Sequence, residues 1–171
     1  MILRSFTLFI AFAIFLASPE APALSASDAA TVLQLAQANN AASRNHNAGK
    51  AFLSANRMKV GVKMLPSGLQ YLIIRPGTGQ RPKATDEVVV HYRGTSIDGK
   101  EFDSSYARGQ PATFPVNRVI AGWTDALQAM RTGAKWKVAI PPELAYGQRG
   151  AGSVIGPNET LLFDIELLAI K

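Results

Sequence analysis

The fold is decided by the stretch Glu87-Val-Val-Val-His-Tyr-Arg-Gly-Thr-Ser-Ile-Asp-Gly-Lys-Glu-Phe-Asp103. Residues 87–97 carry the β-branched and aromatic side chains that strands favour, and residues 100–103 give a second, shorter strand signal. Asp98-Gly99 between them is a strong signal for a tight hairpin turn. The stretch therefore predicts two antiparallel strands, which are the start of a sheet.

Further strand signals lie on both sides of this hairpin, at Leu69–Ile73, Lys135–Ile140 and Thr160–Ile170. One helix interrupts them, starting near Gly122 and stopping at Gly133, with apolar residues at helical spacing: Trp123, Leu127 and Met130. Strands that do not alternate with helices favour an antiparallel sheet. The expected fold class is α+β, with the sheet packed over a single short helix.

The first 26 residues are predicted to be a secretory signal peptide. Arg4 is followed by an uncharged run from Ser5 to Pro19 and then by small residues up to Ala26. This run is shorter than the about 20 apolar residues that cross a bilayer, so no stable membrane span is expected. We expect cleavage and export to the periplasm, and a retained anchor is the alternative.

Residues 27–65 are expected to form a short helical arm and linker. Ser27-Asp28 is the predicted N-cap of a helix over Ala29–Asn39, an asparagine-rich stretch breaks it, and a second helix covers Asn47–Lys59. The second helix has an apolar stripe made mostly of alanine: Ala48, Ala51, Phe52 and Ala55. Because such a stripe buries little area, the helix needs the following domain or a partner chain for stability.

Charge is unevenly distributed along the chain. The formal net charge is +6, and 47% of the residues are hydrophobic. Eight basic and no acidic residues lie between Ala29 and Thr85, whereas nine basic and ten acidic residues follow from Asp86 on. The eight bases are widely spaced and lack interleaved aromatics, so no nucleic-acid binding is predicted. A solvated face, or docking to clients or an anionic surface, is expected instead.

The motifs of nucleotide, metal and hydrolytic sites are incomplete. Gly94–Lys100 satisfies the spacing of a phosphate-binding loop, but Glu101 stands where Ser or Thr is needed and no helix follows. His46 and His91 are the only histidines, and the chain has no cysteine. Ser153 is not part of a G-x-S-x-G elbow. No metal, cofactor or nucleophile is therefore predicted.

Aromatic residues beside turns recur in five ordered motifs: Val90-His-Tyr-Arg-Gly94, Gly99-Lys-Glu-Phe-Asp-Ser-Ser105, Val119-Ile-Ala-Gly-Trp123, Ile140-Pro-Pro-Glu-Leu-Ala-Tyr-Gly147 and Thr160-Leu-Leu-Phe-Asp-Ile-Glu-Leu-Leu168. This series resembles the FKBP-type peptidyl-prolyl cis-trans isomerases. The resemblance implies an isomerase domain over residues 66–171, in which an antiparallel half-barrel sheet wraps over one short helix.

The junction before this domain, at Asn47–Leu53 and Lys63–Tyr71, is similar to that of exported bacterial members related to the macrophage infectivity potentiator. Those relatives have a longer helical region that dimerises them. The arm of this chain is shorter, which leaves a weak homodimer as an open alternative to a monomer.

In the resembling family an apolar pocket lies between the sheet and the helix. The resemblance assigns catalytic roles to Asp103, Tyr146, Ile120 and Phe163, and substrate contacts to Tyr92, Phe102, Val119, Trp123, Ile155 and Arg108. The backbone N–H of Ile120 and the hydroxyl of Tyr146 would donate to substrate carbonyls, and Asp103 would accept from Tyr92 and Arg108.

Other aromatic and apolar residues are expected to have structural roles only. Phe114, Leu127 and Trp136 are assigned to the core. Three positions depart from the commonest family pattern, and we expect them at the rim of the pocket: Ala112, Ala151 and Gly156.

The residue types suit isomerisation of X-Pro bonds. The barrier of about 18–20 kcal/mol comes from lost amide resonance, so no bond to a heavy atom is made or broken. The predicted function is a prolyl isomerase that assists folding in the cell envelope. Its expected partners are proline-containing polypeptides and macrolides of the FK506 type. The alternative is a non-catalytic chaperone that holds unfolded chains.

Overall fold

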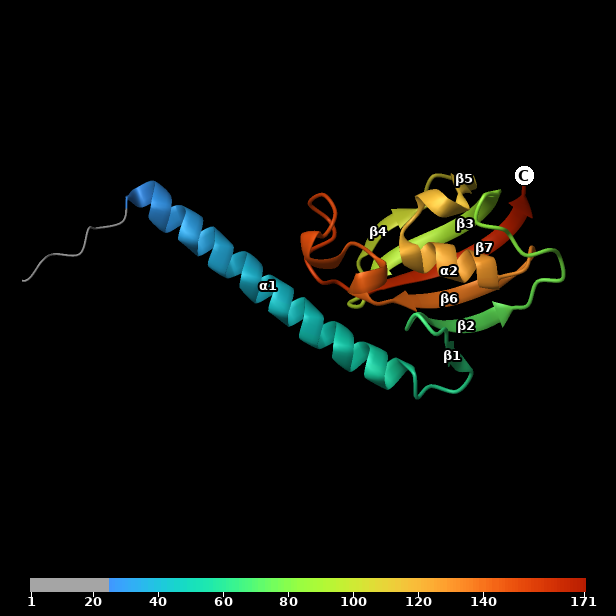
Figure 1. Ribbon diagram of the computed structural model, residues 1–171, viewed down its shortest axis with the longest axis horizontal. Helices are drawn as coiled ribbons and strands as arrows, with labels where there is room; N and C mark the ends of the chain where they lie inside the picture. The colour runs from blue at the N-terminus through green and yellow to red at the C-terminus, as the bar shows by residue number, and fades with distance from the viewer. Residues whose placement is uncertain (1–24) are drawn as a thin grey trace, which may run out of the picture.

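The computed structural model describes residues 25–171, so the predicted signal peptide lies almost wholly outside the described part. An open antiparallel sheet wraps around one short helix, and a long helix extends away from one side of it (Figure 1). The predicted α+β class is confirmed. Among the described helices, none is both long and apolar enough to cross a membrane.

Seven strands form the sheet in the order β1-β2-β6-β7-β3-β4, and β5 pairs with β3 beside β4. Their bounds are β1 Val62–Met64, β2 Gln70–Arg75, β3 Glu87–Ser96, β4 Glu101–Ser104, β5 Ala112–Pro115, β6 Lys135–Ile140 and β7 Leu161–Ile170. Every pair of neighbours is antiparallel. The predicted hairpin is confirmed, with Gly99 at a φ of +88° in its turn.

The core lies between the concave face of the sheet and α2, which spans Ala121–Ala129. Alternate residues of β3 point into it, and Val88 and Val90 are fully buried. Leu127 of α2 and Trp136 of β6 are also buried, which confirms their assignment to the core. Three short 3-10 helices connect these elements: η1 Val116–Arg118, η2 Pro142–Leu144 and η3 Gly147–Arg149.

The long helix α1 runs without interruption over Ala26–Asn56, so the break predicted at the asparagine-rich stretch is wrong. Asparagine weakens helices because its side chain competes for the backbone, but here the side chains of Asn40 and Asn45 have other partners. Asn40 Oδ1 accepts from Arg44 at 2.9 Å, and Asn45 bonds outside the helix. The N-cap is Ser25, whose hydroxyl accepts from the Asp28 amide at 3.2 Å, not Ser27-Asp28.

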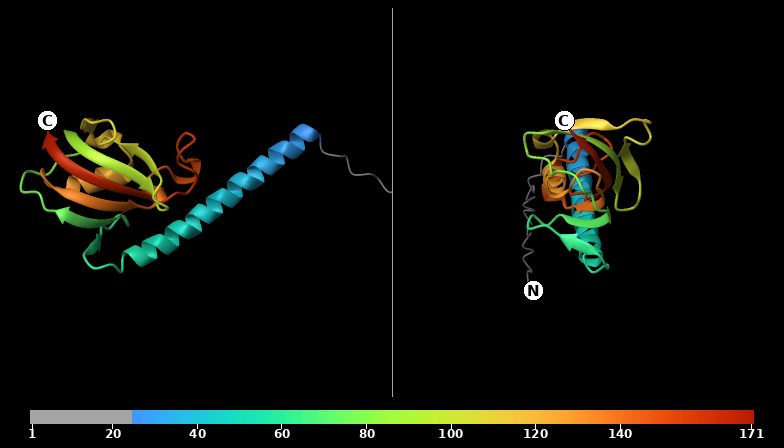
Figure 2. Two further views of the ribbon diagram at one scale, coloured as in Figure 1. Left: turned by 180° about the vertical axis from the view of Figure 1, so that it is seen from behind. Right: turned by 90° about the vertical axis from the view of Figure 1, so that its right-hand side faces the viewer.

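Only the C-terminal half of α1 packs against the domain, and residues 26–40 are exposed (Figure 2). The face in contact recurs at helical spacing: Ala42, Asn45, Gly49, Phe52, Leu53 and Asn56. Of the predicted alanine stripe only Phe52 belongs to it, because Ala48, Ala51 and Ala55 are exposed. A face with asparagine and glycine at its centre carries no hydrophobic signal, which is why the apolar pattern indicated the wrong side.

Candidate active site

A cavity of about 660 Å³ lies between the N-terminal end of α2 and the concave face of the sheet. It is lined by Tyr92, Phe102, Asp103, Phe114, Arg118, Val119, Ile120, Trp123, Tyr146, Val154, Ile155 and Phe163. The structure therefore brings together all of the predicted site residues except Arg108. Sequence reasoning missed three lining residues, Phe114, Arg118 and Val154. The three rim positions that depart from the family pattern are not among the lining residues.

Trp123 forms the floor of the cavity and is only 4% exposed. The rings of Tyr92, Phe163 and Phe114 pack edge-to-face against it, with centroid distances of 5.1, 5.4 and 5.7 Å. Phe102 packs in the same way on Phe163, at 5.5 Å. Each ring restricts the next, because aromatic pairs prefer this geometry. The result is a rigid apolar floor.

Phe114 belongs to the cavity wall and not only to the core, which corrects its assignment from sequence. It stands on β5, where it pairs with Val88 of β3, and its ring contacts Tyr92 at 5.8 Å. The sequence signal was weak because β5 is only four residues long, follows Pro111 and ends at Pro115.

Gly94 on β3 permits the close approach of two cavity rings. A Cβ on Gly94 would lie 2.6 Å from Phe102 Cε2 and 2.7 Å from Phe163 Cε1. Any larger side chain would therefore push these rings into the cavity.

Asp103 stands at the edge of the cavity in a hydrogen-bonded cluster. The Tyr92 hydroxyl donates to Asp103 Oδ2 at 2.5 Å, and Arg108 donates to Asp103 Oδ1. Arg108 also donates to the Tyr92 hydroxyl at 2.8 Å, with its guanidinium 5.5 Å from the Tyr92 ring centre. Arg108 thus supports the wall from behind and does not line the cavity.

This cluster sets the protonation of its members. Burial raises the pKa of Asp103, but the hydrogen bonds from Tyr92 and Arg108 outweigh it and hold the pKa below its ordinary value. Burial, together with the hydrogen bond to Asp103, raises the pKa of Tyr92. At neutral pH the wall therefore contains a carboxylate, a neutral phenol and a guanidinium.

Two hydrogen-bond donors of the cavity have no acceptor among the described residues. Ile120 is the N-cap of α2, and its carbonyl accepts from Trp123 and Thr124 while its amide makes no hydrogen bond within the described residues. Tyr146 is 42% exposed, and its hydroxyl also makes no hydrogen bond within the described residues. Both donors are available to a bound ligand.

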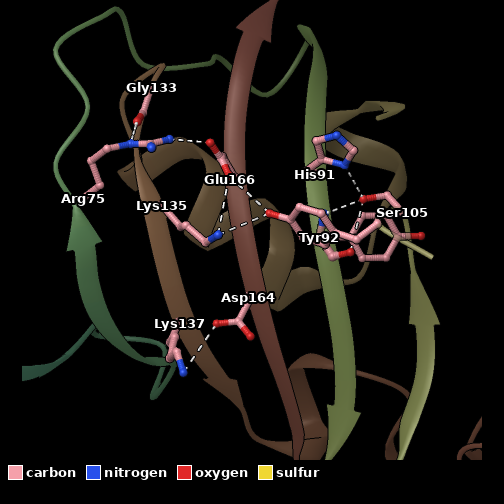
Figure 3. A network of polar contacts seen from close by, with 10 residues as sticks. Arg75, His91, Tyr92, Ser105, Gly133, Lys135, Lys137, Asp164 and Glu166 are labelled. Carbon is pink, nitrogen blue, oxygen red and sulfur yellow. Dashed lines mark hydrogen bonds and ion pairs between the residues drawn. The ribbon is translucent and has the colours of Figure 1, made fainter. Parts of the chain in front are cut away.

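A second polar network lies behind Tyr92 (Figure 3). The buried Ser105 hydroxyl accepts from the Tyr92 amide at 2.7 Å and lies 2.9 Å from His91 Nδ1. Strand β4 ends at Ser104, so beyond it no backbone carbonyl of β4 faces the Tyr92 amide. The Ser105 hydroxyl accepts the hydrogen bond of this amide instead. His91 is a bonded sheet residue, and Ser105 is a supporting residue that the sequence did not reveal.

On the convex face this network continues through side chains that stack and bond in series. The His91 ring stacks on Tyr106 at 4.6 Å, and the Tyr106 hydroxyl donates to Glu166 at 3.2 Å. Arg75 and Lys135 pair with the same carboxylate (Figure 3). Burial raises the pKa of Glu166, but the hydrogen bonds from Arg75 and Tyr106 hold it below its ordinary value.

Comparison with known families identifies the class of this protein. Residues 78–168 match the profile of FKBP-type peptidyl-prolyl cis-trans isomerases. Residues 15–73 match the profile of the domain amino terminal to FKBP-type peptidyl-prolyl isomerase. The chain therefore belongs to the FKBP-type peptidyl-prolyl cis-trans isomerase family.

Individual relatives agree with this placement. The chain is 54% identical over 136 residues to the outer membrane protein MIP of Legionella longbeachae, covering 80% of this chain and 58% of that protein. It is 54% identical over 127 residues to the peptidyl-prolyl cis-trans isomerase Mip of Coxiella burnetii, covering 74% of this chain and 55% of that protein. The chain thus spans less than two thirds of these relatives' lengths.

Among solved structures, that of FkpA from Escherichia coli matches with a TM-score of 0.78 at 43% sequence identity. The match covers 86% of this chain and 74% of that chain. A peptidyl-prolyl cis-trans isomerase from Pseudomonas syringae matches with a TM-score of 0.71 at 44% identity, over 75% of this chain and 95% of that one. These matches agree with the arrangement of sheet and helix described above.

Proposed function

We propose that this chain catalyses the cis-trans isomerisation of X-Pro bonds in polypeptides. The observation that carries the proposal is the rigid aromatic cavity with two available donors, Ile120 N–H and the Tyr146 hydroxyl. The reaction requires neither a nucleophile nor a cofactor, because only the rotation about one amide bond changes. Such a cavity can accelerate this rotation by solvation and positioning alone.

In the proposed mechanism the proline ring lies on the indole of Trp123, against Phe163. The twisted amide is less dipolar than the planar one, so a dry aromatic site disfavours the planar ground state relative to the transition state. The Ile120 amide and the Tyr146 hydroxyl donate to substrate carbonyls and hold the twist. Catalytic roles are accordingly proposed for Ile120, Tyr146, Phe163 and Asp103.

The remaining wall residues shape the binding site. Phe102, Val119 and Ile155 are proposed to contact the residues that flank the proline. Asp103 and Arg108 hold Tyr92 in place, so that its ring stays upright against Trp123. Because the cluster uses its charges internally, it presents little net charge to the substrate.

We further propose that the chain is exported to the periplasm, that residues 1–26 are its signal peptide, and that residues 66–171 are the isomerase domain. A relative named outer membrane protein MIP supports an envelope location. The proposed clients are proline-containing polypeptides of the envelope, and the cavity is also proposed to take a macrolide of the FK506 type.

A second candidate function is non-catalytic holding of unfolded chains. The exposed half of α1 favours it, because Val32, Leu33 and Leu35 are each between 55% and 60% exposed. A weak homodimer through this half is a related proposal. Suppression of aggregation that persists after the cavity is mutated would favour this function over isomerisation.

The deciding experiment is a cis-to-trans assay on a proline-containing peptide. The wild-type chain is expected to accelerate the conversion, FK506 to inhibit it, and Asp103→Ala or the pair Tyr146→Ala and Phe163→Ala to reduce it strongly. The matched control is Asp164→Ala, on the convex face, where Asp164 lies 3.8 Å from Lys137 (Figure 3). A wild-type rate equal to the uncatalysed rate with folded protein would refute the proposal.

A further inference from the structure

The segment Gly150–Thr160 forms one side of the cavity and has little regular structure of its own. It contributes Val154 and Ile155 to the lining, and its one isolated pairing joins Ala151 to Ile155. Its backbone has positive φ at Gly150, Gly152 and Asn158. Segments with few internal hydrogen bonds are held in one conformation by contacts from outside. Helix α1 runs past this segment on the outside of the domain (Figure 1).

Helix α1 contacts this segment through three residues on one of its faces. Asn45 Nδ2 donates to the Pro157 carbonyl at 2.9 Å, and the Ala42 carbonyl accepts from Asn158 Nδ2 at 3.5 Å. Gly49 lies directly against Thr160, so that a Cβ on Gly49 would overlap the Thr160 hydroxyl. The helix therefore contacts the segment through two hydrogen bonds, one of them long, and through the close packing of Gly49 against Thr160.

The segment residues that α1 contacts are also linked to residues of the cavity. The Asn158 amide donates to the Gly147 carbonyl at 2.8 Å, next to Tyr146. On the other side, the Gly156 amide donates to Glu159 Oε1 at 2.9 Å and closes the turn that follows Ile155. The residues that α1 contacts thus follow Ile155 closely in the sequence, and one of them, Asn158, is hydrogen-bonded beside Tyr146.

The residue types on α1 agree with this role. Asparagine and glycine are poor helix formers, so neither Asn45 nor Gly49 is explained by the stability of the helix itself. Gly49 is the buried residue of α1, and Thr160 is 2% exposed. The contact is therefore a packed interface and not a solvated surface.

We propose that α1 positions the Gly150–Thr160 wall of the isomerase cavity, with Asn45 and Gly49 as the positioning residues. The inference rests on the proposed isomerase function. It assigns the arm a role within one chain, whether or not a second chain binds to it.

The first test compares Asn45→Ala with the matched control Asn40→Ala, in which the exposed asparagine bonds only to Arg44. Amide hydrogen exchange at Ile155 and Asn158 is expected to be about threefold to tenfold faster in Asn45→Ala, the loss that corresponds to one hydrogen bond. In the peptide assay, kcat/KM is expected to fall by a similar factor, and Asn40→Ala is expected to match the wild type in both measurements.

The second test introduces a steric overlap between residues 49 and 160 and then removes it. Gly49→Ala is expected to speed exchange at Ile155 and to lower kcat/KM, because the new methyl group overlaps Thr160. Adding Thr160→Ala removes the overlapping hydroxyl, which has no hydrogen-bond partner among the described residues, and is expected to restore most of both quantities. A merely structural role would give lower thermal stability without this rescue of kcat/KM.

The outcomes separate the two proposals. If the wild-type chain lacks isomerase activity, the proposed function fails, and hydrogen exchange alone still decides whether α1 holds the segment. Exchange at Ile155 and Asn158 that is equal in the wild type, Asn45→Ala and Gly49→Ala would overturn the inference. So would altered exchange with unchanged kcat/KM in an active enzyme.

Discussion

Ser105→Ala tests whether one buried hydroxyl holds the β3 strand that carries Tyr92. Ser105 is fully buried, and its hydroxyl is the acceptor for the Tyr92 amide at 2.7 Å and the neighbour of His91 Nδ1 at 2.9 Å. The neighbouring Ser104 offers a matched control. It is also buried, but its hydroxyl accepts only one hydrogen bond, from the Ala107 amide at 3.2 Å.

The expected magnitudes follow from what each change leaves unpaired. Ser105→Ala leaves the buried Tyr92 amide without a hydrogen-bond acceptor, and an unsatisfied buried donor costs about 1–3 kcal/mol. Ser104→Ala removes one long, partly buried hydrogen bond, worth about 0.5–1 kcal/mol. At a few degrees per kcal/mol, the melting temperature is expected to fall by about 5–10 °C for Ser105→Ala and by about 2–4 °C for Ser104→Ala.

Thermal unfolding followed by circular dichroism, with a urea titration to check that the m-value is unchanged, measures both variants. The Tyr92 hydroxyl is also expected to shift relative to Asp103, so kcat/KM should fall in Ser105→Ala and not in Ser104→Ala. Equal stabilities for the two variants would refute the reasoning, because they would mean that Tyr92 finds another acceptor.

Three further outcomes are expected. Because the pKa of Asp103 is depressed in the folded chain, its stabilising contribution is complete above about pH 4 and is lost as pH falls through that lower pKa. Urea titrations should therefore show a wild-type advantage over Asp103→Asn at pH 7 that vanishes in acid. Gly94→Ala should lower kcat/KM about tenfold or more, since it displaces Phe102 and Phe163, and steady-state kinetics tests this. Arg75→Ala should change the free energy of unfolding by less than about 1 kcal/mol, because the Arg75 side chain is 54% exposed; a larger loss in a urea titration would contradict this.

The sheet could be predicted because its signals are local. Alternation along β3 and β7, the Asp98-Gly99 turn and the helical spacing in α2 each depend on residues close in sequence. The interruption of α1 was predicted for the same reason and was wrong. Local propensity places asparagine outside helices, whereas Asn45 is stabilised by the distant Pro157 carbonyl.

The cavity was predicted from sequence motifs, and residues to which the motifs assign no role were missed. Phe114, Arg118 and Val154 lie outside the five matched stretches, and the resemblance assigned none of them a place in the pocket. Ser105 lies inside one of them, yet a serine has no recognisable role until the end of β4 is known. Residues that act through a neighbour's backbone leave no pattern in the sequence.

The excess basic charge of this chain is not concentrated at the cavity. Among the described residues, the charged side chains that line the cavity are Asp103 and Arg118, one of each sign, so the site has little net charge with which to attract a ligand. On the convex face, Arg75 and Lys135 share the single Glu166 carboxylate, which offsets one of their two positive charges. Of the eight bases between Ala29 and Thr85, only Arg44 and Lys50 lie on α1. Five others form no ion pair among the described residues: Arg57, Lys59, Lys63, Arg81 and Lys83. Attraction of this chain to an anionic surface would therefore depend mainly on the residues that follow α1, and it leaves the proposed chemistry at Trp123 unaffected.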